Sequence, residues 1–187
     1  MGMWRRLLRN GLGSGAIVLV LGLLAFGLPA LDRSLDSTQA LPDDVPYHVG
    51  GGVTVIPPPG ALLDVTKTRP SDDRGTVLFL VGPIRYAVVV QPFDGGLPDA
   101  ADKLRRKIAA NRGYQVVGRE ASIATADGQL LGLAGGYSAP GRGGRYAVFL
   151  AGERSIEVTV SGTDPQLSAA RAVIDTSTRS ITVRGAE

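Results

Sequence analysis

Residue types that commonly carry out catalysis are few in this chain of 187 residues. A hydrolytic triad needs a histidine base beside its nucleophile, and the chain has a single histidine, His48. We interpret His48 as a surface residue near the start of the folded domain. Zinc and copper sites usually take several histidine or cysteine ligands, and the chain has no cysteine. The sequence therefore predicts neither a hydrolytic triad nor a transition-metal site.

The carboxylates form no recognisable pair or cluster. Two separated carboxylates can cleave glycosides, and Glu120, Glu153 and Glu157 are the available candidates. Their spacing is that of ordinary acids on strands and turns. Calcium needs clustered oxygen ligands at loop spacing, whereas the side chains of Asp43-Asp44 and Asp72-Asp73 diverge on an extended chain. We expect these acids to lie in solvated loops and strands.

One glycine cluster, residues 141–144, could resemble a phosphate-binding loop. It lacks the GxxxxGK[ST] and GxGxxG patterns and joins two expected strands, whereas a phosphate loop opens a helix. We interpret it as the tip of a hairpin. The five tyrosines are scattered singly and form no stacking platform. We therefore predict that the protein is not an enzyme and needs no cofactor or metal.

The positions that most clearly indicate a location are at the N-terminus. Residues 11–31 carry no charge, and Arg5, Arg6 and Arg9 directly precede them. As a helix rising about 1.5 Å per residue, such a segment reaches about 30 Å, the thickness of a hydrocarbon core. Cationic flanks stay cytoplasmic. We expect a cytoplasmic flank at 1–10, a transmembrane helix at 11–31 and an extracytoplasmic, periplasmic-side body.

A cleaved signal peptide is the alternative interpretation of this segment. Its apolar region is usually shorter and ends at a small-x-small site, and the candidate sites here end at Ala30 and Ala40. A lipid-anchored cysteine is excluded, since there is no cysteine. Small residues let membrane helices approach closely. Gly11, Gly15 and Gly22 are thus candidates for a contact with a partner helix.

The exported part is electrically neutral. Three of the 20 basic residues are Arg5, Arg6 and Arg9, which leaves 17 bases against 17 acids from Asp32 onward. A neutral body has no basic field for nucleic acid, so we expect no nucleic-acid partner. Residues 32–47 are polar and contain prolines, which predicts an extended spacer. The folded domain is then expected at 48–187.

The first half of that domain is typical of strands separated by breakers. Expected strands at 53–56, 76–81 and 85–91 are divided by the run Pro57-Pro58-Pro59-Gly60 and by Gly82-Pro83. Residues 77–81 and 87–90 are continuously apolar, a pattern typical of strands that are covered on both faces.

A helix is expected to follow, with Pro98 in its first turn and Gly113 after its end. Apolar residues at 4-3-4 spacing give it a narrow buried stripe, namely Leu97, Ala101, Leu104 and Ile108. Basic residues cover the rest. Lys103, Arg106 and Lys107 are candidates for contact with a partner or with lipid head groups; the alternative is a solvated helix face.

The second half is expected to be a four-strand meander followed by a second helix and a last strand. Asp127-Gly128 favours a tight hairpin, and the alternation in 156–160 predicts a strand with one wet face. Asp164-Pro165 should open the second helix, whose apolar stripe is Leu167, Ala170 and Ile174. The class is α+β, an antiparallel sheet packed by two helices.

The stretch Gly52-Val53-Thr54-Val55-Ile56-Pro57-Pro58-Pro59-Gly60 resembles a pattern of one family. Together with the expected strand pair, helix and meander, it is similar to the exported actinobacterial members of the PsbP-like fold, with Ala61 where those members often have tryptophan. The resemblance covers about residues 48–185 and implies an α-β-α sandwich. Relatives include the lipoprotein LpqN, MmpL accessory proteins and type VII secretion-associated proteins, which implies a non-catalytic adaptor role.

Two functions remain open from the sequence. The first is a single-pass accessory subunit of a cell-envelope membrane complex, which docks through its transmembrane helix and its exported domain. The second is a domain that binds or carries an envelope lipid, which would require a non-polar cavity. A hydrolase is a third hypothesis, for which the residues supply little.

Overall fold

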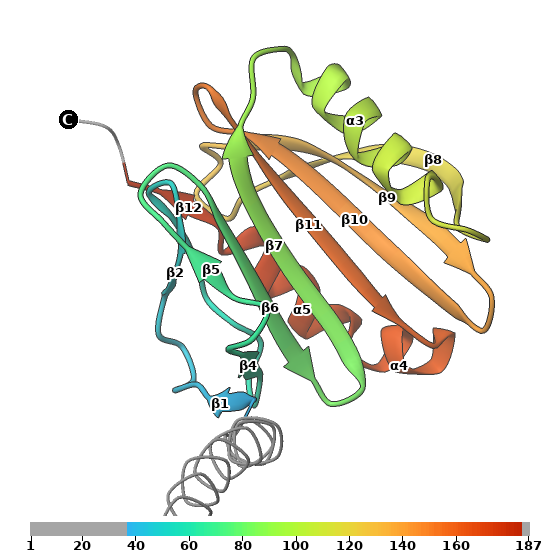
Figure 1. Ribbon diagram of the computed structural model, residues 1–187, viewed down its shortest axis with the longest axis horizontal. Coiled ribbons are helices and arrows are strands. Elements are labelled where there is room, and N and C mark those ends of the chain that lie inside the picture. The colour runs from blue at the N-terminus through green and yellow to red at the C-terminus, as the bar shows by residue number, and fades with distance from the viewer. Residues whose placement is uncertain (1–36, 185–187) are drawn as a thin grey trace, which may run out of the picture. The chain divides into compact units, whose positions relative to one another are not determined.

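The computed structural model describes residues 37–184, whose strands form two antiparallel sheets (Figure 1). The nine-stranded sheet has the order β1-β4-β6-β7-β11-β10-β9-β8, with β5 beside β6. Its strands are β1 (Thr38–Ala40), β4 (Leu62–Asp64), β5 (Arg69–Pro70), β6 (Gly75–Val81), β7 (Ile84–Pro92), β8 (Gln115–Ala124), β9 (Leu131–Ala139), β10 (Arg142–Leu150) and β11 (Arg154–Gly162). The smaller sheet has the order β12-β3-β2 and consists of β2 (Tyr47–Gly50), β3 (Val53–Val55) and β12 (Thr182–Val183).

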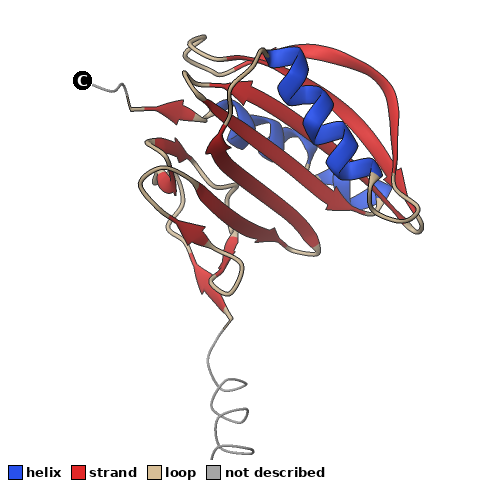
Figure 2. Ribbon diagram, turned by 45° about the horizontal axis from the view of Figure 1, so that its top comes forward, coloured by secondary structure: helices blue, strands red, loops and turns tan. Residues whose placement is uncertain are grey.

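Three helices lie on opposite faces of the large sheet. Helix α3 (Leu97–Ala109) covers one face, while α4 (Asp164–Ala169) and α5 (Arg171–Arg179) lie on the other (Figure 2). The expected order of strands, helix, four strands, helix region and strand is confirmed, as is the α+β class with an antiparallel sheet.

The main core lies between the large sheet and the layer that contains α5 and the small sheet. Val88 on β7 pairs with Val158 on β11 and Val77 on β6, so the three side chains project from the same face. All three are fully buried or nearly so. Ile174 on α5 and Ile181 cover them from the other layer.

A second core lies between α3 and strands β8–β10. Three residues of the predicted stripe, Ala101, Leu104 and Ile108, are buried together with Ala100, and the fourth, Leu97, is half-buried against the same core. They pack against Tyr137, Tyr146 and Val148. The helix begins after Gly96, whose backbone N–H donates to the Asp99 carboxylate at 3.1 Å.

Two tyrosines lie over two glycines between β9 and β10. Tyr137 pairs with Gly144, and Tyr146 pairs with Gly135. A side chain at Gly144 would collide with the ring of Tyr137, and one at Gly135 would collide with Tyr146. The glycine-rich stretch 141–144 is therefore only partly a hairpin tip, because Gly143 and Gly144 belong to β10.

The strand over 156–160 does not have the predicted wet face. Glu157 lies on the face that was expected to be wet, but its side chain is only 2% exposed. Helix α3 covers that face of β11, where Lys107 contacts the Glu157 carboxylate. The second helix is divided at Ala170, where the backbone leaves the helical region (φ −93°, ψ 3°). Its predicted stripe still packs as expected, since Ile174 is buried and Leu167 and Ala170 pack against the main core.

The predicted spacer 32–47 is incorrect in its second half. Thr38–Ala40 form β1, which pairs with β4, and Leu41 packs against the main core. The Asp43 carboxylate also accepts a hydrogen bond from the Gly60 N–H at 3.0 Å. The expected transmembrane segment lies outside the described residues, and no helix within 37–184 is long and apolar enough to cross a membrane.

Candidate functional site

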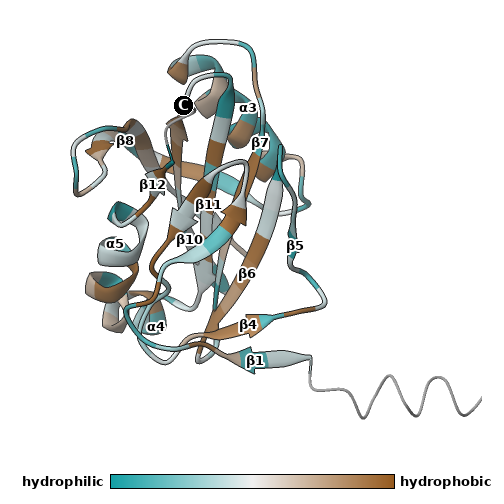
Figure 3. Ribbon diagram, turned by 90° about the vertical axis from the view of Figure 1, so that its left-hand side faces the viewer, coloured by the Kyte–Doolittle hydropathy of each residue, from teal (hydrophilic) through white to brown (hydrophobic). Residues whose placement is uncertain are grey.

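An apolar surface on β4, β6 and β7 is the main candidate site. Strands β6 and β7 alternate between fully buried and half-buried residues, and β4 and β6 are mostly hydrophobic (Figure 3). The half-buried set faces away from the main core. We call the apolar side chains on this face, including the exposed Leu62 on β4, the open sheet face. Its members are Leu62, Leu78, Leu80, Ala87 and Val89.

The strand register makes these side chains neighbours. Leu62 is directly opposite Leu80, and Leu78 is directly opposite Ala87. Residues that pair in this way project from the same face at close distance. The five side chains therefore form one continuous surface across three strands.

Within residues 37–184, α3 borders this surface at Val89 and lies beside the rest of it (Figure 1). Its five members belong to neither hydrophobic core, and Leu62 is 39% exposed. Helix α3 lies over β8–β10 instead, and β6 and β7 run uncovered beside it (Figure 1). The sequence-based prediction that both faces of β6 and β7 are covered is therefore wrong for the face that carries these residues.

A groove runs from the open sheet face under the C-terminal half of α3. It has a volume of about 260 Å³ and is lined mainly by apolar and aromatic side chains. The groove connects the open sheet face with the second core. Val89 of the open sheet face lines the groove together with residues of that core, namely Leu104, Ile108, Tyr114 and Tyr137.

Two of the basic residues predicted to contact a partner lie along the same edge of α3. The Lys107 ammonium donates to the buried Glu157 carboxylate at 3.0 Å, and Gln91 donates to the same carboxylate at 2.5 Å. Lys103 lies 5.2 Å from the centre of the Phe93 ring. Arg106 is exposed and forms no ion pair with any described residue.

The charged residues around the open sheet face are mainly basic. Arg69 pairs with Thr76 and Arg85 with Leu80, which places both on this face. The nearby carboxylate of Asp64 is engaged in its own turn, where hydrogen bonds from Thr66 and Lys67 lower its pKa despite some burial. Glu157 is already paired with Lys107. The rim therefore has an excess of positive charge.

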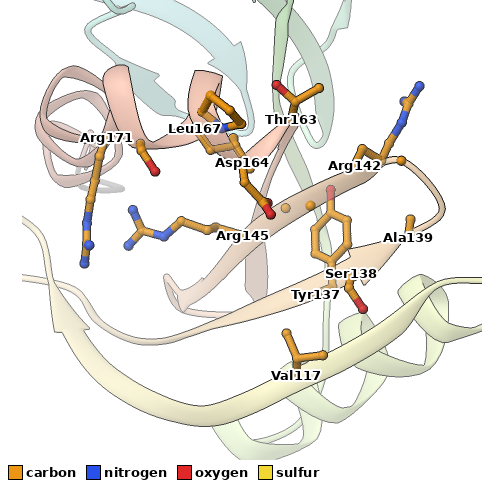
Figure 4. A pocket seen from close by; sticks show the side chains of 15 residues that line it. Val117, Tyr137, Ser138, Ala139, Arg142, Arg145, Thr163, Asp164, Leu167 and Arg171 are labelled. Atoms are coloured by element: carbon orange, nitrogen blue, oxygen red, sulfur yellow. The ribbon is translucent and has the colours of Figure 1, made fainter.

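A second, open cleft lies where α4 meets the end of the β9–β10 hairpin. It has a volume of about 870 Å³ and includes three arginines, Arg142, Arg145 and Arg171 (Figure 4). Arg145 forms an ion pair with Asp175 at 2.6 Å, and Arg171 lies 3.8 Å from the same residue. The glycine cluster 141–144, which we interpret from the sequence as a hairpin tip, lines this cleft. The arginines come from separate elements and form no sequence motif.

Tyr137 forms part of the wall of both cavities. Its hydroxyl donates to the Val160 carbonyl at 2.9 Å. Burial and the neighbouring Tyr114 raise its pKa to about 12. Burial also raises the pKa of Tyr146, whose hydroxyl donates to Glu120 at 2.8 Å. Both hydroxyls therefore act as neutral structural donors.

The acids considered for catalysis lie apart in the structure. Glu120 contacts Arg105 and Tyr146, whereas Glu157 contacts Lys107 and Gln91 on the other side of α3. His48 is exposed on β2. No group of three or more metal-binding side chains occurs in the part of the chain that the structure describes. Gly11, Gly15 and Gly22 lie outside it.

The fold is similar to that of a solved protein structure. This is cyanobacterial PsbP (CyanoP) from Synechocystis sp. PCC 6803, with a TM-score of 0.51 and 15% sequence identity over 80% of this chain and 94% of that chain. At this identity the likeness shows the fold alone, and the chain has a PsbP-like fold. No family model and no curated protein matches the sequence.

Proposed function

We propose that this chain is a non-enzymatic, membrane-anchored accessory subunit whose exported domain docks on a partner protein. The observation that carries the proposal is the open sheet face. Apolar side chains that are not needed by either core gain stability when a partner covers them. Contiguous apolar strands with one uncovered face are what such a docking site requires.

The charge around the open sheet face defines the chemistry of the partner. Arg69 and Lys103 lie beside an apolar centre, an arrangement that fits an apolar segment flanked by carboxylates. Protein interfaces commonly have this form, with an apolar centre and a polar rim. Complementary charges at the rim mainly accelerate association and select the partner.

A protein partner is better supported than a lipid cargo. A lipid carrier needs a non-polar cavity. The groove under α3 has only about 260 Å³, less than the ~300–1,000 Å³ of small-molecule sites. The larger cleft of about 870 Å³ is open and lined by arginines.

The anchor in this proposal is the uncharged segment 11–31, oriented by Arg5, Arg6 and Arg9. Gly11, Gly15 and Gly22 would contact a helix of the partner. The closer relationship that we propose is to the actinobacterial LpqN-like adaptors. The body of the chain would then lie on the periplasmic side of the cell membrane.

The test is co-purification of the full chain from its native host in mild detergent. A Leu78→Lys, Leu80→Lys double variant places two charges on the open sheet face without touching either core. We expect at least about a tenfold loss of the co-purifying partner, because a buried charge at the centre of an interface costs more than ~1.4 kcal/mol. Leu131→Lys is the matched control, since Leu131 is 68% exposed and lies on β9.

Three outcomes would contradict the proposal. The wild-type chain would be recovered only as a lone monomer, or the double variant would retain its partner as well as the Leu131→Lys control does. Alternatively, native mass spectrometry would find a bound lipid that the double variant loses, which would favour the carrier function. Thermal unfolding of each variant shows whether the fold is intact.

A further inference from the structure

Two arginines at one end of the large sheet have no carboxylate partner. Arg85 follows the β6–β7 turn, and Arg142 begins β10. Neither forms an ion pair or a side-chain hydrogen bond with any residue in 37–184. By contrast, Arg105 and Arg145 at other positions are paired with acids.

Arg85 and Arg142 line one cavity together. It has a volume of about 320 Å³, and its other polar side chains are Ser161, Thr163 and Gln166. No carboxylate is among the residues that line it. Two guanidinium groups with hydroxyl and amide donors are well matched to a phosphate, because the planar fork of arginine forms paired hydrogen bonds with its oxygens.

Arg142 also lines the larger cleft, where its side chain points away from Arg145 and Arg171 (Figure 4). Thr163 lines both cavities as well, so the two adjoin. In the larger cleft, Arg145 and Arg171 share Asp175, and Asp164 is the one acid in the lining. Positive charge therefore exceeds negative charge across the whole end of the sheet.

The chain enters the folded domain at the same end. Strand β1 pairs with β4, and Leu62 of β4 pairs with Leu80 near the end of β6. Leu80 is in turn opposite Arg85, across the turn at Gly82-Pro83. The proposed anchor ends at residue 31 in the sequence, and the intervening residues 32–37 reach at most about 25 Å when fully extended.

We infer that Arg85 and Arg142 form a binding site for the phosphate groups of anionic lipid head groups. The inference depends on the membrane anchoring in the proposed function. Residues 32–37 are few, so they would hold the domain close to the membrane, where lipid head groups are the nearest phosphates. Basic groups near an anionic membrane are attracted to its surface. This contact would fix the orientation of the domain, with the Arg85 end of the open sheet face at the membrane and Ala87 and Val89 further from it.

The test uses the full chain in lipid nanodiscs, either of phosphatidylcholine alone or with added phosphatidylglycerol. Amide hydrogen exchange is followed in the two turns, residues 81–85 and 140–144. We expect severalfold slower exchange in the anionic discs than in the neutral ones. An Arg85→Gln, Arg142→Gln double variant should lose this difference. Arg119→Gln, which removes an exposed arginine on β8, should retain it.

Equal exchange in both kinds of disc would overturn the inference, as would equal protection in the double variant. If inorganic phosphate added to neutral discs gives the same slowing, the site binds free phosphate and the assignment to lipid is wrong. The Arg85→Gln and Arg142→Gln single variants serve if the double variant does not fold, and each should lose part of the difference between the two kinds of disc. A chain that does not remain in the discs would refute the anchoring itself, whereas a retained chain without the lipid effect refutes only the arginine site.

Discussion

Tyr137 on β9 illustrates how one buried side chain connects β10, β11 and the segment that follows α3. Its ring lies over Gly144, its hydroxyl donates to the Val160 carbonyl, and Tyr114 stacks on it with ring centres 5.8 Å apart. The neutral phenol is the form that this environment stabilises, because ionisation would place a charge in a nearly dry site.

The raised pKa of Tyr137 predicts a loss of stability in alkali. The folded state holds the phenol proton more tightly than the unfolded chain, whose tyrosine pKa is about 10. The contribution of the protonated Tyr137 phenol to the free energy of unfolding is therefore complete below about pH 10. It is lost as the pH rises from about 10 towards the folded-state pKa of about 12.

We expect Tyr137→Phe to lower the free energy of unfolding by about 1 kcal/mol near pH 8, because a buried hydrogen bond is lost. The difference from the wild type should shrink between pH 10 and 12. Urea unfolding at several pH values measures this, with Tyr114→Phe as a control for removing a neighbouring hydroxyl. A difference that stays constant to pH 12 would contradict the assignment.

The β9–β10 hairpin is held in register by its paired tyrosines and glycines. Each glycine provides the space that the opposite ring fills, so the two strands fit only in one alignment. The glycines were visible in the sequence, but the space that they leave for the tyrosine rings was not. Which residue faces each glycine depends on the register between β9 and β10.

Gly144→Ala should therefore destabilise the protein by about 3 kcal/mol, because the added methyl group collides with the Tyr137 ring. Gly136→Ala is the matched control on β9, where the nearest atom would be 3.5 Å away. Its stability should be unchanged or raised by up to about 1 kcal/mol. Chemical unfolding compares the two, and equal losses would show that the ring is not the cause.

Local sequence patterns predicted the helices and strands better than they predicted which side chains are buried. The stripe Ala101, Leu104 and Ile108 predicted α3, because helical periodicity is encoded within a few residues. The burial of Glu157 and the partial exposure of Leu78 were not predictable in this way. Both depend on where α3 lies across the sheet, which is decided by packing between distant segments.

The same limit applies to the candidate sites. Lys103, Arg106 and Lys107 were correctly placed on one helix, but the sequence could not show that Lys107 is engaged by Glu157. The arginine-lined end was missed because Arg85 and Arg142 lie far apart in the sequence, on β7 and β10, and are brought together only by the strand order.

The boundary of the folded domain lies earlier than the composition indicated. Strand β1 covers the edge of β4, and the segment after it contributes Leu41 to the core and the Asp43 carboxylate to the Gly60 N–H. A polar, proline-containing segment can thus be part of a fold when short pairings and single contacts hold it.

We expect a chain that begins at Thr38 to be more stable than one that begins at Tyr47 by about 2 kcal/mol, the combined effect of lost apolar burial and hydrogen bonds. The shorter chain should also aggregate more, because β4 becomes an uncovered edge. Urea unfolding and light scattering provide the measurements. Identical unfolding midpoints would mean that β1 contributes nothing to the fold.

Strand β8 at the opposite side of the sheet has an interruption between Val117 and Ala121, where Gly118 adopts a positive φ of 76°. Its irregular backbone turns Glu120 towards Arg105, and a straight foreign strand finds no continuous ladder of N–H and C=O groups there. Fibril-like growth from that border is thereby discouraged. A companion that meets this edge must then recognise side chains rather than extend the backbone ladder.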